Sequence, residues 1–174
     1  GQFESEQAAS RTLLLTSIIS IVVIFLLLYV QFKNAIHSGI ILMNLPFALI
    51  GGVFVLMFSS GEISIPAIIG FISLFGIATR NGMLLISHYN DLMTQGNSLK
   101  DSIIQGSLDR LNPILMTALT SALALIPLAL NGDLPGNEIQ SPMAKVILGG
   151  LLTSTLLNAF VIPIVYELIN RKKK

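Results

Sequence analysis

Long runs of apolar residues, separated by short polar segments, dominate the chain. Five of these runs are long enough to cross a hydrocarbon core of about 30 Å, which takes some 17–25 helical residues. They cover residues 12–30, 36–58, 65–89, 113–130 and 144–166. Backbone groups in lipid must be hydrogen-bonded within the protein, and runs of this length meet that requirement as helices. The pattern therefore predicts an all-α integral membrane fold, a bundle of five transmembrane helices over residues 12–170.

The polar segments predict how the spans are connected. Residues 31–35 form a tight loop, which makes the first two spans a hairpin. Residues 59–62 form a second short loop, and residues 131–137 are rich in turn formers. The longest connector, residues 90–112, predicts a helix of its own at about residues 98–110.

Two features define this connector helix. Ser98 and Asp101 have the spacing of a capping box. The apolar residues that follow recur at roughly helical spacing, which predicts an amphipathic helix lying on the cytoplasmic membrane surface. A helix that binds a partner, or is simply solvated, fits the same pattern.

The two ends of the chain are polar. Residues 1–11 are expected to be a periplasmic connector that leaves a water-soluble domain, and residues 171–174 a basic cytoplasmic tail. We therefore expect the chain to be the C-terminal piece of a longer protein. Seven Lys and Arg residues fall on one side of the predicted membrane and two, Arg11 and Lys145, on the other. The positive-inside rule then places the N-terminus outside and the C-terminus inside.

Composition supports this class. Charged residues make up 11% of the chain, against about 25% in soluble domains. The chain contains no cysteine, which excludes disulfides, thiolate metal sites and cysteine nucleophiles. A net charge of +1 gives no nucleic-acid footprint. There is also no phosphate-binding glycine loop and no nucleophile constellation. We therefore expect neither an enzyme nor a cofactor, and membrane lipid rather than nucleic acid as the surroundings.

Arg80 is the only formally charged residue in the interior of any predicted span. A charge at that depth costs roughly 2.5–3.5 kcal/mol on insertion scales, so it marks a functional site by default. Its span ends nine residues further on, about 13 Å away, which is too far for the side chain to reach the interface comfortably. Snorkelling is the alternative. Ser73, Gly76 and Ser87 share its helix face, and Asn81 flanks it.

Polar and small residues recur in the last two spans. Arg110 and Thr117 are seven residues apart, on one side of the fourth span. Gly150, Ser154 and Asn158 follow at intervals of four, which predicts a helix-packing seam, as does Gly76 in the third span. Packing is the favoured interpretation of the Ser and Thr residues, whereas Asn158 is open between packing and function. Pro46, Pro127 and Pro163 indicate kinks, which can also act as hinges.

No Asp or Glu lies inside any predicted span. The counter-ion of Arg80 is therefore expected from another subunit or from a missing N-terminal part. Acid–base clusters of this kind relay protons in coupled transporters. No metal site is predicted, because His37 and His88 lack spaced partner ligands. Met83 and Met116 could bind soft ions, but packing is the favoured interpretation.

The chain resembles the last five transmembrane helices of resistance–nodulation–division (RND) efflux pumps. The residues that carry the resemblance are GQFES at Gly1–Ser5, PFALIGG at Pro46–Gly52, GFISLFGIATRNG at Gly70–Gly82, RLNPILMT at Arg110–Thr117, and Gly149–Gly150. The resemblance covers essentially the whole chain. The amino-acid sequence of the third-span motif resembles the heavy-metal branch more than the multidrug branch.

The resemblance implies a secondary active transporter, a proton antiporter that exports heavy-metal cations. Arg80 falls where multidrug members place a relay lysine, and Arg110 and Thr117 fall where the family places an arginine and a threonine of the same relay. With Asn81, they would form the basic and hydroxyl side of a proton relay whose acidic residues lie in the N-terminal half.

The same resemblance implies the assembly and its location. We expect a homotrimer in the bacterial inner membrane, with a periplasmic adaptor and an outer-membrane channel as partners. The two membrane halves of such pumps are parallel repeats. The alternatives are a multidrug or organic-compound RND permease and a non-transporting membrane assembly module. The sequence does not specify the substrate.

Overall fold

The computed structural model describes residues 1–59, 61 and 63–171. Within them the chain is helical apart from short connections. The six helices are α1 (Gln2–Phe32), α2 (Ala35–Leu42), α3 (Asn44–Phe58), α4 (Ile65–Thr94), α5 (Leu99–Leu130) and α6 (Gln140–Arg171). Two of the predictions, the loop at 59–62 and the tail at 171–174, fall partly on residues outside this description.

The predicted all-α membrane bundle is confirmed. Five helices or helix pairs of the described chain are long and apolar enough to span a membrane, and these are α1, α2 with α3, α4, α5 and α6. Each contains one of the predicted runs. The helices extend beyond the runs at one or both ends, because polar residues next to an apolar run can continue the same backbone hydrogen bonding.

Polar caps fix several helix ends. Lys33 closes α1 with a left-handed backbone, φ 52°, and its N–H donates to the Tyr29 carbonyl. The side chain of Asn34 then accepts hydrogen bonds from the first turn of α2. Ser64 caps α4 through the Ala67 N–H, at 3.3 Å. Ser98 caps α5 through the Asp101 N–H, at 3.2 Å. The short connections between helices therefore supply the polar groups that cap the neighbouring helix ends.

The second span is broken at Met43, between α2 and α3. The break has a local cause at Pro46, because a proline cannot donate a hydrogen bond to the carbonyl four residues earlier and its ring clashes with that carbonyl. The carbonyl concerned is that of Leu42, the last residue of α2. The predicted kink is thus a helix boundary.

The fourth span differs from the prediction in its N-terminal part. The segment expected to be a separate surface helix, about residues 98–110, continues through Pro113 into the predicted span, so that α5 is one helix of 32 residues. Such a helix is about 48 Å long, which exceeds the thickness of a hydrocarbon core. The first, polar turns of α5 therefore extend the span rather than lie across it.

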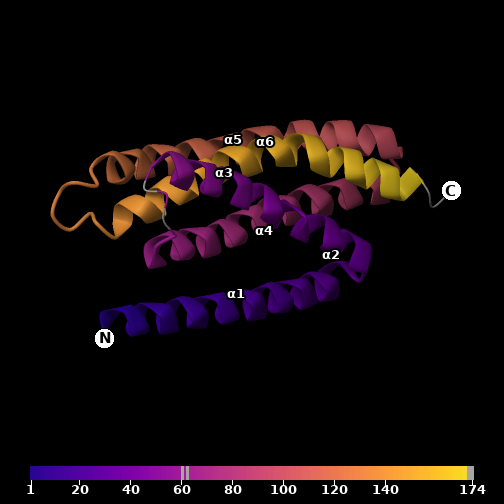
Figure 1. The fold of residues 1–174 in the computed structure, drawn as a ribbon. Coiled ribbons are helices and arrows are strands. Elements are labelled where there is room, and N and C mark those ends of the chain that lie inside the picture. Colours follow the sequence, from indigo (N-terminus) through magenta and orange to yellow (C-terminus); the bar gives the residue numbers. More distant parts are fainter. Residues whose placement is uncertain (60, 62, 172–174) are drawn as a thin grey trace.

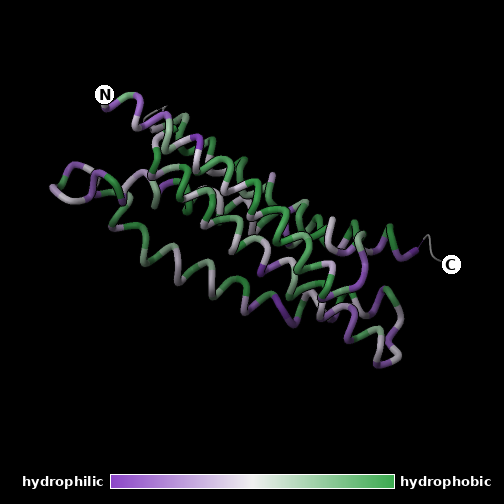
Figure 2. Tube along the Cα trace, turned by 90° about the horizontal axis from the view of Figure 1, so that it is seen from below, coloured by the Kyte–Doolittle hydropathy of each residue, from purple (hydrophilic) through white to green (hydrophobic). Residues whose placement is uncertain are grey.

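The helices form a bundle in which α6 packs against α3, α4 and α5. Helix α1 lies along one side and contacts α2 and α4 (Figure 1). The N-terminus and the loop before α6 lie at one end, and the C-terminus lies at the other (Figure 1). Hydrophobic residues follow most of the length of the helices, and hydrophilic ones gather towards the ends (Figure 2). Many large apolar side chains of α1 and α5 are exposed, as a lipid-facing surface requires.

Candidate functional site

Helix α4 has one packed face and one open face. The packed face contains Ala67, Gly70, Leu74, Ala78, Asn81, Gly82, Leu85, Ile86 and Tyr89. Between Ile65 and Tyr89, the exposed positions of α4 are Ile69, Ser73, Gly76 and Arg80, at intervals of four, three and four residues. Since such intervals keep residues on one side of a helix, Arg80 belongs to a continuous open stripe.

The open stripe makes no contact with other helices that would neutralise Arg80. Among residues 1–59, 61 and 63–171, the guanidinium has no hydrogen bond or ion pair. A Cβ built on Gly76 would meet no atom within 4 Å. Gly76, expected to be a packing position, therefore lies on open surface in this chain. A partner helix for the stripe has to come from outside it.

Arg110 and Thr117 lie on the half-buried side of α5. The Thr117 hydroxyl donates to the Pro113 carbonyl at 2.9 Å, a common bond for a hydroxyl inside a helix. Ser121, four residues further on, is also half-buried. The predicted seven-residue spacing therefore places Arg110 and Thr117 on one side of the helix, with Thr117 towards the middle.

The register between α4 and α5 sets the relative heights of these groups. The helices run antiparallel, and His88 is bonded to Asp109. Arg80 lies eight residues before His88, and Thr117 lies eight residues after Asp109. Equal rises of about 1.5 Å per residue bring Arg80 and Thr117 to the same height. No hydrogen bond joins the two side chains, and Arg110 lies about 10 Å further towards the bundle end.

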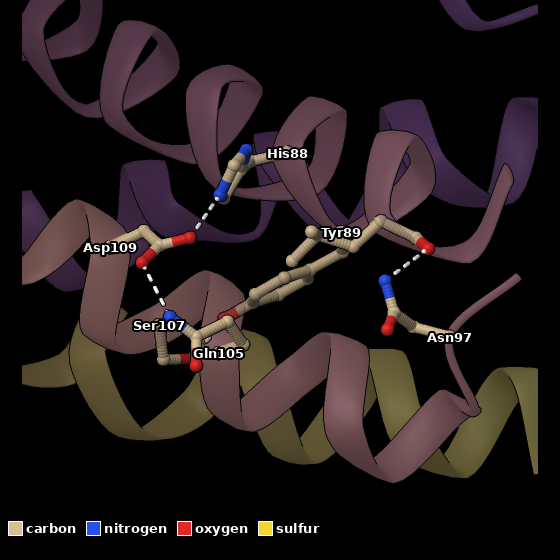
Figure 3. Close-up of polar contacts among 7 residues, drawn as sticks. His88, Tyr89, Asn97, Gln105, Ser107 and Asp109 are labelled. Atoms are coloured by element: carbon tan, nitrogen blue, oxygen red, sulfur yellow. Dashed lines mark hydrogen bonds and ion pairs between the residues drawn. The ribbon is translucent and has the colours of Figure 1, made fainter. Parts of the chain in front are cut away.

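A polar cluster joins α4 to α5 at that end (Figure 3). The ring N–H of His88 donates to Asp109 Oδ2 at 2.8 Å. Gln105 Nε2 donates to Asp109 Oδ1 at 2.7 Å. The Tyr89 and Ser107 hydroxyls share a further hydrogen bond across the same interface. Asp109 thus has hydrogen-bond donors on both oxygens.

The cluster continues onto α6 and α2. The Tyr166 hydroxyl donates to Asn90 Oδ1 at 2.6 Å. Asn90 Nδ2 in turn lies 3.5 Å from His37 Nδ1. The rings of Tyr89 and Tyr166 are 5.1 Å apart. These side chains connect α2, α4, α5 and α6 into one polar unit, which the sequence reasoning missed. The short 95–98 connection was the available signal, because it makes α4 and α5 antiparallel neighbours.

Asn81 points away from the open stripe, into the packed side of α4, where its side chain is buried. Gly150, Ser154 and Asn158 are also buried, on the side of α6 that meets α3 and α4. A Cβ on Gly150 would collide with Leu74 of α4 and approach the Ala48 carbonyl of α3. The predicted seam thus lies where three helices meet.

Metal ligands do not gather in the described part of the chain. No group of three or more His, Cys, Asp or Glu residues there could hold a metal ion. Met83 packs against the core cluster of Ile41, Ile86 and Tyr89. Met116 is 67% exposed, on the outer side of α5.

Comparisons with known proteins give matches over nearly the whole length of the chain. The family model of AcrB/AcrD/AcrF proteins matches residues 1–170. The chain is 38% identical over 172 residues, 99% of its length and 16% of the relative's, to the cobalt-zinc-cadmium resistance protein CzcA of Cupriavidus metallidurans. It is 37% identical over 174 residues, 100% of its length and 16% of the relative's, to the nickel-cobalt-cadmium resistance protein NccA of Alcaligenes xylosoxydans xylosoxydans.

A solved structure gives the same result. The crystal structure of a heavy metal efflux pump superposes with a TM-score of 0.88 and 36% identity, over 98% of this chain and 17% of that one. The chain spans about a sixth of the length of the relatives it matches.

Proposed function

Because the chain belongs to the AcrB/AcrD/AcrF family, we propose that it is the C-terminal membrane part of a proton-driven pump that exports heavy-metal cations. Two relatives that it matches over their corresponding segment are resistance proteins named for cobalt, zinc, cadmium and nickel. We infer a divalent heavy-metal cation as the substrate class. Residues of the substrate path lie mostly in parts of the pump that this chain does not contain.

The observation that carries this proposal is the unpartnered Arg80 on the open stripe of α4. A guanidinium near the middle of a span is retained only with a partner or a water-filled cavity. The partner in this proposal is a carboxylate of the N-terminal half, packed against the stripe of Ser73, Gly76 and Arg80. Gly76 would allow that helix to approach closely.

Arg110 and Thr117 supply the rest of the basic and hydroxyl side of the relay. Thr117 lies at the height of Arg80, and Arg110 lies nearer the cytoplasmic end. Asn81, the fourth residue assigned to the relay, is buried on the packed side of α4 and would act from that side. Protonation of the carboxylates would weaken their attraction to Arg80 and Arg110, and the α4 and α5 helices would then shift relative to the N-terminal half. That movement would drive the periplasmic part of the cycle.

The whole pump is proposed to be a homotrimer in the bacterial inner membrane, with a periplasmic adaptor and an outer-membrane channel. The N-terminus of this chain would be periplasmic and its C-terminus cytoplasmic. The support for this orientation is the seven-to-two excess of Lys and Arg at the cytoplasmic side. Lys33, Lys100 and Arg171 all lie at the same end of the bundle as the polar cluster.

The test uses the intact parent protein in an efflux-deficient bacterium. Arg80→Ala should abolish resistance to zinc, cobalt and cadmium salts, and in proteoliposomes it should abolish metal transport driven by a pH gradient. Arg80→Lys should retain part of both activities, because it keeps the charge. Arg11→Ala, which removes an exposed arginine outside the predicted spans, is the matched control and should change neither.

Each other outcome has a defined meaning. Unchanged proton-driven export in Arg80→Ala would refute the relay. Resistance of the parent to dyes or detergents instead of metals would identify an organic-compound permease of the same family. If the parent confers no resistance and transports none of these substrates, the transport proposal fails.

A further inference from the structure

Two asparagines lie unpaired in the middle of the bundle. Asn44 of α3 is 0% exposed and Asn158 of α6 is 1% exposed. In the described part of the chain, neither the oxygen nor the nitrogen of either amide has a hydrogen-bond partner. The hydroxyl of Ser154, one turn before Asn158, is also buried and unpartnered. Each unpaired polar group buried in this way costs about 1–3 kcal/mol, so three side chains in one region require an explanation.

The contacts between α3 and α6 put these side chains at one height. The Thr153 hydroxyl donates to the Phe47 carbonyl at 2.7 Å and accepts from the Gly51 N–H at 3.2 Å. The two helices run antiparallel, so residues just before Phe47 lie level with those just after Thr153. Asn44 on α3 therefore faces the stretch of α6 from Ser154 to Asn158.

Contacts with α4 point to the same place. The atom closest to a Cβ built on Gly82 is Nδ2 of Asn44, and the Ile41 and Ile162 side chains lie within 3.5 Å of it. Ile162 is one turn after Asn158 on α6. The amide of Asn44 thus lies beside Gly82 on the packed side of α4, together with the fully buried side chains of Ile41 and Ile162. Asn158, one turn before Ile162 on α6, is placed near the same point.

We propose that Asn44, Ser154 and Asn158 form an internal hydration site in the C-terminal half of the membrane domain. Buried waters typically make about three hydrogen bonds to polar groups that lack protein partners. Amides and hydroxyls offer both donors and acceptors without net charge, which suits a neutral ligand. Gly82, which the site adjoins, is two residues from Arg80, and the positive charge of that residue disfavours a bound cation.

This site is distinct from the open stripe. Arg80 lies on the open side of α4, and the hydration site lies against Gly82 on the packed side. Helix α4 would therefore meet water on its packed side at the height at which it meets the N-terminal half on its open side. The proposal does not depend on the proposed transport activity.

The test is X-ray hydroxyl-radical labelling of the intact parent protein, in which bound water produces radicals that modify adjacent side chains. Ile41 and Ile162 should be labelled several-fold more than Val146, which is equally buried but lies away from the three polar side chains. Combining Asn44→Leu with Asn158→Leu should reduce their labelling to the level of Val146. Asn170→Leu, the same change at the end of α6, should leave it unchanged.

Labelling of Ile41 and Ile162 no higher than that of Val146 in the unmodified protein would overturn the proposal, whether or not the variants fold. So would labelling that persists in the folded double variant. A density map of the intact pump in which the two amides bond directly to each other, with no solvent between them, would also overturn it. Metal resistance is measured separately, so the two proposals can fail independently.

Discussion

A group of polar side chains at one end of the bundle is paired, whereas a second group in its middle is unpaired. At the end, His88, Tyr89 and Tyr166 each have a hydrogen-bond partner on another helix of the same chain. In the middle, the amides of Asn44 and Asn158 have none within the described residues. Arg80, at the same height, has no ion pair there. These three side chains at the end find their partners within this chain, whereas those in the middle require groups that the chain does not supply.

The α3–α6 interface also contains a close approach of two backbones. A Cβ on Gly51 of α3 would collide with the Gly149 backbone carbonyl of α6, and one on Gly149 would meet Gly51 in turn. Close approach of this kind is how small residues pack membrane helices. The unpaired Asn44 therefore lies on the same α3–α6 interface, about 10 Å along α3 from a contact that has no room to adjust.

The largest expected effect follows from this contact. Gly51→Ala should destabilise the α3–α6 interface by about 1–3 kcal/mol, because the added methyl group forces the two backbones apart. In the intact protein, amide hydrogen exchange of α3 and the facing part of α6 should become roughly 5- to 150-fold faster, since local opening follows that free energy.

The control for this change is Gly39→Ala on α2, where a Cβ would meet no atom within 4 Å. Alanine is about 0.5–1 kcal/mol better than glycine inside a helix, so exchange in α2 should slow slightly or stay unchanged. If both substitutions had the same effect, helix propensity rather than close packing would govern this region.

The fold could be predicted largely from the sequence, because spans depend on apolar length alone. The predicted resemblance to RND efflux pumps of the heavy-metal branch is also confirmed. The break at Met43 was not predicted, since a proline within a span permits either a kink or a boundary. The fourth span was predicted to begin at residue 113, but α5 continues through Pro113, because the residues before it can form helix as well.

The candidate site could be predicted less completely. The rarity of charge in a span is enough to select Arg80 from the sequence. The direction in which the Arg80 side chain points depends on the rotation of α4 about its own axis relative to α6. The hydrophobic pattern of the sequence constrains that rotation only loosely. The end cluster depends on the register between α4 and α5, and a register difference of a single residue would separate His88 from Asp109. The short 95–98 connection indicates that α4 and α5 are neighbours, but which side chains pair across them follows from packing.

A smaller effect is expected at the end of the bundle. Tyr166→Phe removes the donor to Asn90 Oδ1 while keeping the buried ring. A neutral buried hydrogen bond contributes about 1 kcal/mol, so exchange in the C-terminal turns of α6 and the facing part of α4 should rise about fivefold. Tyr29→Phe, at an exposed position of α1, is the matched control. An unchanged exchange rate in Tyr166→Phe would show that water replaces the lost bond.

The smallest effect is expected for Asp109→Ala. His88 and Gln105 lose their common acceptor, but the side chains of His88 and Asp109 are 24% and 39% exposed, so water can satisfy the donors that remain. Exchange in the first turns of α5 should therefore rise less than in Tyr166→Phe. Asp91→Ala removes an exposed carboxylate of α4 that has no side-chain partner among the described residues, and it gives the baseline. A rise in Asp109→Ala that equals or exceeds that of Tyr166→Phe would mean that the exposed pair stabilises the end as strongly as the buried one. The stability of the paired cluster at the end of the bundle would then come from charge pairing rather than from buried hydrogen bonds.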